Sequence, residues 1–490
     1  MVRTDVFRGY GKIEELSAQT AVECRFGGEV ETVLSAHASA TLLTAVADNG
    51  EIKYTGRVHF SIVYEDAERR VCRAEKGVEF AAKAQSERCC PAYTARVRVE
   101  TQTVSVRREG ASVYLMALLG AEITLYGDQT FEYLTDGDLI LRRESLPMLT
   151  AHLCGGAAET DDEFETDFIG DILLHSESVN VTQVHCETGT LAAEGEVNLG
   201  ILALKGENAL VSFERLVPFR VEIPCEAAAA GMNAEVRVNV SNISLRAETD
   251  EEQGKCKIVA ELNLAAEGCV YEETAIDAVT DAYSLTHAVN LTFGNAESCG
   301  TGETIRLTER ISGKAALSSA VDFSDTFQAV TLQRAEANLS RADGARVEGV
   351  AMATLLVLGA DGSHRGVEIS LPFSVPVTVE GDYAVSVLAC GTSARQRQEG
   401  EVDAEVTLKI SLVQKTRREV NAVIAAETGD ALTLSDSAVS VYVPRAGDGL
   451  WELSKSLKKP PEEVAANNPD IEFPIKEGQR VIIYRKKSLS

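Results

Sequence analysis

The sequence predicts a mainly β protein: three tandem antiparallel modules, each sandwich-like or barrel-like, followed by a small β-α-α-β unit. Three observations support this fold class. An alternating strand pattern recurs three times, a fixed spacing recurs within each copy, and apolar residues change to helical spacing after residue 440. Alternation with a period of two is what a strand with one buried face requires, because successive side chains point to opposite faces of the sheet.

The repeated segment runs from a glycine to a phenylalanine 24 positions later: Gly56 to Phe80, Gly195 to Phe219, and Gly349 to Phe373. The residues after each glycine alternate in the same phase. The aligned inward positions are Val58, Phe60, Ile62 and Tyr64; Val197, Leu199, Ile201 and Ala203; and Ala351, Ala353, Leu355 and Val357. A second mark, Gly27, Gly170 and Gly313, recurs every 143 residues, and we expect a bulge or turn at each.

These marks divide the chain into β modules at residues 1–130, 163–273 and 306–430, with a C-terminal domain at 440–485. The intervening segments 131–162 and 274–305 have a weaker pattern, and the first contains the acidic run ETDDEFETD. We therefore predict that both are solvated linkers. Motion between domains arranged in a row is the default expectation.

Composition restricts the function classes. The net charge of −28 repels nucleic acid phosphates and anionic lipid, so neither is an expected partner. The chain shows no signal-peptide core and no apolar run near the roughly 20 residues that span a membrane, so we expect a protein that stays where it is made, without membrane insertion. Eleven cysteines without a C-x-x-C spacing suggest free thiols in a reducing cytosol.

No catalytic motif is found, and we expect no enzyme activity, no metal and no cofactor. The seven histidines are scattered without a metal-ligand spacing. Neither a phosphate-binding Gly-x-x-x-x-Gly-Lys-Ser/Thr loop nor a Gly-x-Ser-x-Gly nucleophile turn occurs.

The C-terminal segment has local helix signals. Leu450, Leu453 and Leu457 fall at helical spacing, and Pro461 suits the first turn of a second helix. Asn468-Pro469 stops that helix. Short strands are expected before and after the helices, and a basic tail follows at Arg485, Lys486 and Lys487, which is either solvated or helps to dock an acidic partner.

This segment resembles a LysM domain through Gly447, Asp448, Leu450, Leu453, Val464, Asn468, Pro469, Ile471, Gly478, Gln479, Val481 and Ile483. The upstream modules resemble SPOCS domains, through the repeat layout, the Val217-Pro218-Phe219 and Leu371-Pro372-Phe373 segments, and TDAYSL at 280–285. SPOCS modules in front of a LysM are the domain order of the SipL-type spore envelope proteins.

The resemblance implies a spore coat scaffold in the mother-cell cytoplasm, at the forespore surface, whose LysM docks the SpoIVA-like coat-basement ATPase or another envelope protein. The alternative is a carbohydrate-binding protein whose LysM binds peptidoglycan N-acetylglucosamine. Self-association through exposed edge strands is compatible with the first hypothesis.

By position in the LysM pattern, the groove or docking surface comprises Gly447, Asp448, Gly449, Leu450, Trp451, Asn468, Pro469, Asp470, Ile471 and Phe473. Gly449 replaces the usual Thr and removes a hydroxyl from the groove edge. Trp451, the single tryptophan, has three open interpretations: a sugar-stacking platform, an anchor in a protein interface, or a residue of the small core.

Overall fold

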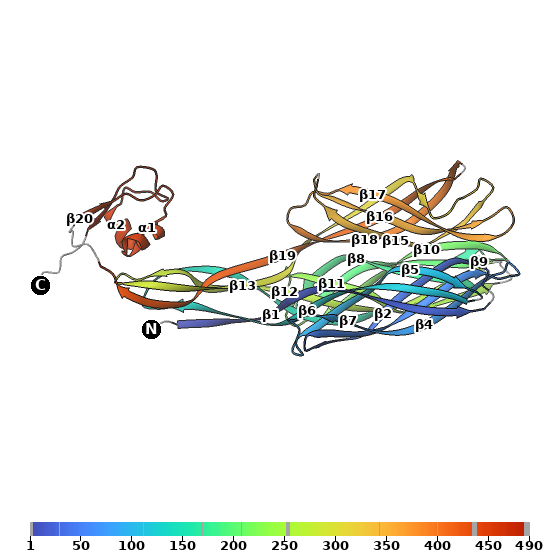
Figure 1. The fold of residues 1–490 in the computed structure, drawn as a ribbon, viewed down its shortest axis with the longest axis horizontal. Coiled ribbons are helices and arrows are strands. Elements are labelled where there is room, and N and C mark those ends of the chain that lie inside the picture. Colours follow the sequence, from blue (N-terminus) through green and yellow to red (C-terminus); the bar gives the residue numbers. More distant parts are fainter. Residues whose placement is uncertain are drawn as a thin grey trace.

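The computed structural model describes residues 3–28, 30–110, 112–167, 170–206, 208–250, 255–342, 344–398, 400–433 and 439–484. This part of the chain is mainly β, in small antiparallel sheets, with two short helices near its end (Figure 1). This confirms the prediction of a mainly β, antiparallel protein. None of its helices is long and apolar enough to cross a membrane. The basic tail 485–487 lies outside the described residues.

The first six strands form two three-stranded sheets, in the orders β1-β6-β5 and β2-β3-β4. Their bounds are β1 (Arg3–Gly27), β2 (Thr32–Asp48), β3 (Glu51–Glu65), β4 (Val71–Gln85), β5 (Thr94–Glu109) and β6 (Ser112–Asp136). Both sheets contribute to one core, in which Ile52 and Phe60 of β3 and Leu115 of β6 are fully buried. The module is therefore held by the inward faces that the alternation predicts.

The same strand order recurs twice. The second set pairs as β11-β12-β7 and β10-β9-β8, and the third as β13-β19-β18 and β14-β17-β16-β15. The bounds are β7 (Ile140–Asp167), β8 (Ile172–Glu187), β9 (Thr190–Lys205), β10 (Ala209–Pro224), β11 (Asn233–Asp250), β12 (Lys255–Tyr283), β13 (His287–Lys314), β14 (Ala316–Leu317), β15 (Thr326–Ser340), β16 (Arg346–Leu358), β17 (His364–Pro376), β18 (Asp382–Gln398) and β19 (Glu401–Ala431). We call these three sets of strands modules one, two and three.

The glycine-to-phenylalanine spacing corresponds to a cross-strand pair in each module. Gly56 lies opposite Phe80, Gly195 opposite Phe219, and Gly349 opposite Phe373. In each pair the phenylalanine ring covers its glycine so closely that a Cβ there would lie 2.6 to 2.8 Å from the nearest ring carbon. Such aromatic cover of a strand glycine fixes the strand register.

The other glycine marks lie where the first long strand of each module ends. Gly27 is the last residue of β1, Gly170 lies between β7 and β8, and Gly313 is next to the end of β13. At these points the chain passes from one sheet of the module to the other.

The two predicted linkers are strands, which corrects the domain division. Residues 131–162 comprise the end of β6 and most of β7, and residues 274–305 comprise the end of β12 and most of β13. The acidic run in β7 keeps the period of two, with exposed carboxylates at alternate positions and Phe164 half-buried between them. Lysines of the neighbouring strand β12 pair with these carboxylates, as Lys255 does with Glu165 at 2.8 Å. A charged surface on one face of a strand was thus mistaken for a loop.

The long strands form a stalk of three ribbons, β1 with β6, β7 with β12, and β13 with β19. The ribbons extend from one end of the molecule and converge (Figure 1). Their inner side chains share one apolar cluster, to which Phe7, Tyr133, Met148, Ile276 and Val420 belong. Each ribbon buries its apolar face against the other two.

The rest of the strands form a head in which the three modules contact one another directly. Leu34 and Val63 of module one, Leu202 of module two and Leu356 of module three belong to one buried cluster. The modules therefore do not follow one another in a row, and burial of this shared cluster opposes the expected motion between them.

A polar contact also joins the three modules. His364 of β17 donates its backbone N–H to Glu65 of β3 at 2.8 Å, and its Nε2 lies 3.0 Å from the carbonyl oxygen of Asn208. The side chains of His364 and Glu65 are 2% and 5% exposed. One residue of each module thus takes part in a single junction, in which His364 and Glu65 are buried.

The last elements are β20 (Val439–Tyr442), α1 (Leu450–Leu457), α2 (Pro461–Asn467) and β21 (Val481–Tyr484). The two strands pair antiparallel, and Leu453, Leu457 and Val464 are buried with Val481 in one small core. Helices and strands therefore occur in the order that the local signals predict. We call these elements and their loops the C-terminal unit.

Candidate docking site

The two loops of the predicted groove are joined by backbone hydrogen bonds. Gly447 donates its N–H to the Ile475 carbonyl at 2.8 Å, and Ile475 donates its own to the Asp448 carbonyl at 2.9 Å. Gly447 has a φ of +94°, a conformation that glycine adopts without strain. The Asp448 carboxylate accepts the Arg445 N–H at 3.0 Å and so closes the turn. The structure thus brings the loop after β20 beside the loop before β21.

The start of α1 is fixed by a side chain of the same helix. Glu452 accepts the N–H of Gly449 at 3.1 Å. This bond satisfies one of the amide groups that a helix start leaves without an intrahelical acceptor. Leu450 is half-buried against the small core, so it contributes to packing.

Asn468 connects α2 to β21. Its side-chain amide donates to the carbonyls of Val464 and Ile482, both at 2.9 Å, and its carbonyl accepts the Ile482 N–H at 2.8 Å. Asn468 is 8% exposed, and both of its amide hydrogens are used inside the unit. Its role here is structural support of the loop that follows.

That loop carries the remaining predicted residues. Pro469 and Asp470 are exposed, whereas Ile471 and Phe473 are half-buried against the core of the unit. The accessible part of the predicted surface is therefore formed by Gly447, Pro469 and Asp470, with the edges of the two apolar side chains.

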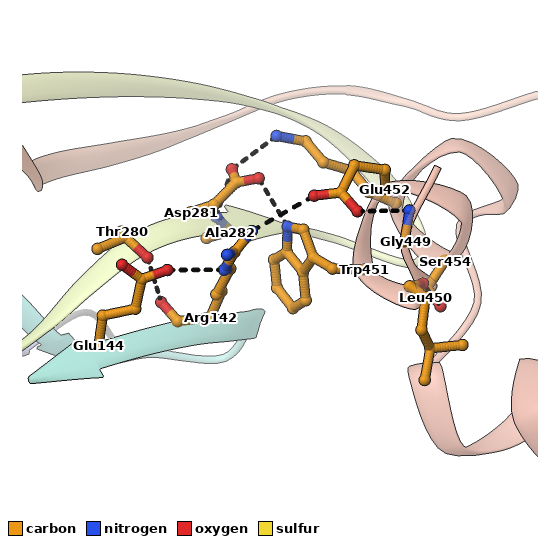
Figure 2. A network of polar contacts seen from close by, with 11 residues as sticks. Arg142, Glu144, Thr280, Asp281, Ala282, Gly449, Leu450, Trp451, Glu452 and Ser454 are labelled. Carbon is orange, nitrogen blue, oxygen red and sulfur yellow. Dashed lines mark hydrogen bonds and ion pairs between the residues drawn. The ribbon is translucent and has the colours of Figure 1, made fainter. Parts of the chain in front are cut away.

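Trp451 contacts the end of the second stalk ribbon (Figure 2). Its indole Nε1 donates to the Asp281 carboxylate at 2.8 Å, and its ring meets the Tyr283 ring edge-on, with centroids 5.2 Å apart. Both partners belong to β12. Trp451 is not a member of the small core of the C-terminal unit, and it joins this unit to the stalk within the chain.

Further contacts surround the indole. Lys455 Nζ lies 2.6 Å from the second carboxylate oxygen of Asp281, and Glu452 pairs with Arg142 of β7 at 3.3 Å. The Tyr283 hydroxyl donates to the Lys459 carbonyl at 2.6 Å. We call the stalk side of this contact, Arg142, Asp281 and Tyr283, the stalk tip.

The titration of the stalk tip follows from these contacts. Burial alone raises the pKa of Asp281, but the hydrogen bonds from Lys455 and Trp451 outweigh it, so the pKa of this carboxyl lies below its ordinary value. Burial raises the pKa of Tyr283 to about 12, so its hydroxyl stays protonated and remains a donor. Near neutral pH the stalk tip presents one carboxylate and one phenol to α1.

Part of the contact between Trp451 and the stalk tip could be anticipated from the sequence. Asp281 and Tyr283 belong to the TDAYSL segment that marks the resemblance to SPOCS domains, but no sequence pattern connects this segment to a tryptophan 170 positions away. Arg142 lies in a predicted linker, so its role was missed altogether.

The head contains a cavity of about 1900 Å³ at its centre, where all three modules meet. Residues of eight strands that each form the edge of a sheet line it, β2, β5, β8, β10, β11, β14, β15 and β18, together with residues of inner strands. Hydroxyl and amide side chains are frequent on its wall, among them Ser35 and Asn198, which are both buried. Within the described ranges, no group of three or more His, Cys, Asp or Glu side chains is placed to hold a metal ion. The eleven cysteines are free thiols.

The fold and the site together define a mainly β protein with three modules of one topology, a common stalk and a small C-terminal unit docked at the stalk tip. Residues 169–248 match the family model described as SipL, SPOCS domain. The matched part covers β8, β9, β10 and nearly all of β11, and the strands in the same topological positions are β2–β5 and β15–β18. Searches of curated proteins and of solved structures gave no significant match.

Proposed function

We propose that this chain is a non-enzymatic scaffold of the spore envelope, in which three SPOCS-type modules present a C-terminal LysM domain that docks a partner protein. The SPOCS match at residues 169–248 supports a sporulation-related role. We place the chain in the mother-cell cytoplasm at the forespore surface, with a SpoIVA-like ATPase as the partner. Each module would then be a β-sandwich of the SPOCS kind.

One observation carries the proposal. The C-terminal unit lies at the far end of the stalk, away from the head (Figure 1). A recognition unit in that position is accessible to a large partner without a collision with the head. The stalk then acts as a spacer of defined length, because its three ribbons share an apolar core.

A pull-down from sporulating cells tests the proposal. The full chain and a truncated chain of residues 1–433 serve as baits, and the truncation leaves the last strand of the stalk, β19, complete. We expect that the full chain recovers the SpoIVA-like ATPase and that the truncated chain does not. Equal recovery of this ATPase by both baits would refute docking through the C-terminal unit.

The second candidate function is binding of N-acetylglucosamine oligomers by the same unit. It is favoured by the hydrogen bonds that bring the Gly447–Asp448 turn beside Ile475, since a LysM groove lies between these two loops. Titration of the full chain with chitin oligomers, followed by calorimetry, tests it. Binding weaker than millimolar would count against a sugar site.

Self-association is a third proposal, compatible with the first. Eight edge strands line the central cavity, so edges outside it, such as those of β1 and β4, would have to make such a contact. Light scattering of the purified chain distinguishes a monomer from an assembly.

A further inference from the structure

The stalk tip covers the side of α1 that carries Trp451. The indole is held by a hydrogen bond to Asp281 and by the edge-on contact with Tyr283. The Lys458 ammonium also lies over the Tyr283 ring, 5.8 Å from its centroid. A partner that recognised this side of α1 would meet the stalk first.

The second ribbon is specialised for this contact. Its Asp281 gives one carboxylate oxygen to Trp451 and the other to Lys455, so both are used by the C-terminal unit. The first ribbon also ends in a Thr-Asp pair, but its Asp136 binds Arg143 of β7, at 3.0 Å. Asp136 therefore serves within the stalk, whereas Asp281 serves the contact with α1.

We infer that the stalk tip is an intramolecular latch that controls access to the Trp451 side of the C-terminal unit. The inference rests on the proposed function, because it concerns the same docking unit. With the latch closed, Asp281 and Tyr283 occupy Trp451. With the latch open, Trp451 and Lys455 become available to a partner that offers a carboxylate beside an aromatic ring.

The contact consists of ion pairs, hydrogen bonds and ring contacts. Its ion pairs, Asp281 with Lys455 and Arg142 with Glu452, are partly exposed, with side-chain exposures of 22% to 52%. Ion pairs of this kind stabilise weakly. No apolar cluster is shared between the C-terminal unit and the stalk among the described residues, since the core of the unit is its own. A partner that binds only the open state can therefore shift the equilibrium.

The affinity of the partner reports the state of the latch. If only the open state binds, the apparent dissociation constant is the intrinsic constant divided by the open fraction. Removal of the Asp281 carboxylate takes away the acceptor for both Trp451 and Lys455. We expect the open state to gain about tenfold, and the affinity for the partner to rise by up to the same factor.

The latch is tested first without a partner. Trp451 is the single tryptophan, so its fluorescence reports this contact and no other site. In the full chain, Asp281→Ala should shift the emission to longer wavelength and increase quenching by acrylamide, because the indole becomes more exposed to water. The matched control is Asp136→Ala, which removes the equivalent aspartate of the first ribbon and should leave the spectrum unchanged. An unchanged spectrum in Asp281→Ala would overturn the latch.

The second measurement uses the purified SpoIVA-like ATPase. Asp281→Ala should bind it about three- to tenfold more tightly than wild type, whereas Asp136→Ala should bind it as wild type does. A spectral shift in Asp281→Ala without tighter binding would show that the contact does not control access, and would overturn the inference. If the truncated chain 1–433 bound the ATPase as well as wild type, the proposed function would fail, and the fluorescence arm would still decide whether the contact exists.

Discussion

Replacement of Gly195 by alanine should destabilise module two, because the close Gly-Phe contact leaves no room for a methyl group. The backbone conformation of Gly195 is open to alanine, since its φ is not positive. The cost is therefore steric. A Cβ at this position would lie 2.3 Å from the carbonyl oxygen of Asn180 and 2.6 Å from Cζ of Phe219.

The size of the stability loss in Gly195→Ala depends on whether the groups around the new methyl group can shift. The Phe219 ring is 6% exposed and packed in the module core, and the Asn180 carbonyl belongs to the adjacent strand β8. Neither yields without local separation of β8 from β9 or displacement of the ring. Insertion of a methyl group into such a packed site costs about 1–3 kcal/mol, and the backbone contact places Gly195→Ala near the upper end.

Urea unfolding followed by hydrogen exchange and mass spectrometry measures this effect, because peptides of β8–β10 report on module two separately from the rest. Gly27→Ala is the matched control: Gly27 ends strand β1, and a Cβ there would meet nothing within 4 Å. We expect no loss of stability in the control. A Gly195→Ala protein as stable as the control would refute the steric explanation of the repeat.

Three more predictions follow from the structure. His364→Ala should cost about 1 kcal/mol and speed hydrogen exchange around Asn208, because Glu65 keeps one partner while the Asn208 carbonyl loses its own; protection equal to wild type would contradict the junction. Since the pKa of Asp281 is lowered in the folded chain, its stabilising contacts are complete above about pH 4 and are lost as the pH falls through the lowered pKa. Trp451 emission should therefore be constant from pH 7 to about pH 5 and shift to longer wavelength only in stronger acid; a shift near pH 6 would contradict this assignment. A reducing agent should leave the unfolding transition unchanged, because the cysteines are free thiols, and a stabilisation lost on reduction would contradict this.

The module fold was accessible to sequence analysis because its signal is local. Alternation after Gly56 predicted the buried positions Val58, Phe60 and Ile62, all of which are 0% exposed. The constant spacing to Phe80 was visible as well. The cause of this spacing could not be predicted from the sequence, since only the pairing of β3 with β4 shows that the Phe80 ring covers Gly56.

The linker prediction was wrong for a physical reason. Strand β7 carries Glu159, Asp161, Glu163 and Glu165 on one exposed face. Its half-buried face holds Asp162 and small or polar residues beside Phe164, so hydrophobicity alone gives little alternation. The partners that stabilise this strand, such as Lys255, are 90 positions away. Charge runs in long antiparallel strands therefore look like solvated loops until the facing strand is known.

In the C-terminal unit, too, the local elements could be predicted from the sequence and the long-range contacts could not. Its helices were predictable from Leu450, Leu453 and Leu457 and from the Asn468-Pro469 stop, all of which act within a few residues. The position of Trp451 against Asp281 was not predictable, because contacts between distant elements leave no periodic signal. The arrangement of the three modules around a common stalk was hidden for the same reason.

The central claim is that the C-terminal unit recognises a protein and that the modules present it. Calorimetric titration of the purified SpoIVA-like ATPase into the full chain and into residues 1–433, with chitin oligomers as the competing ligand, tests this claim most directly. The account predicts a binding isotherm with the full chain, none with the truncated chain, and no displacement by the oligomers. Equal binding by the two chains, or displacement of the ATPase by the sugar, would contradict it.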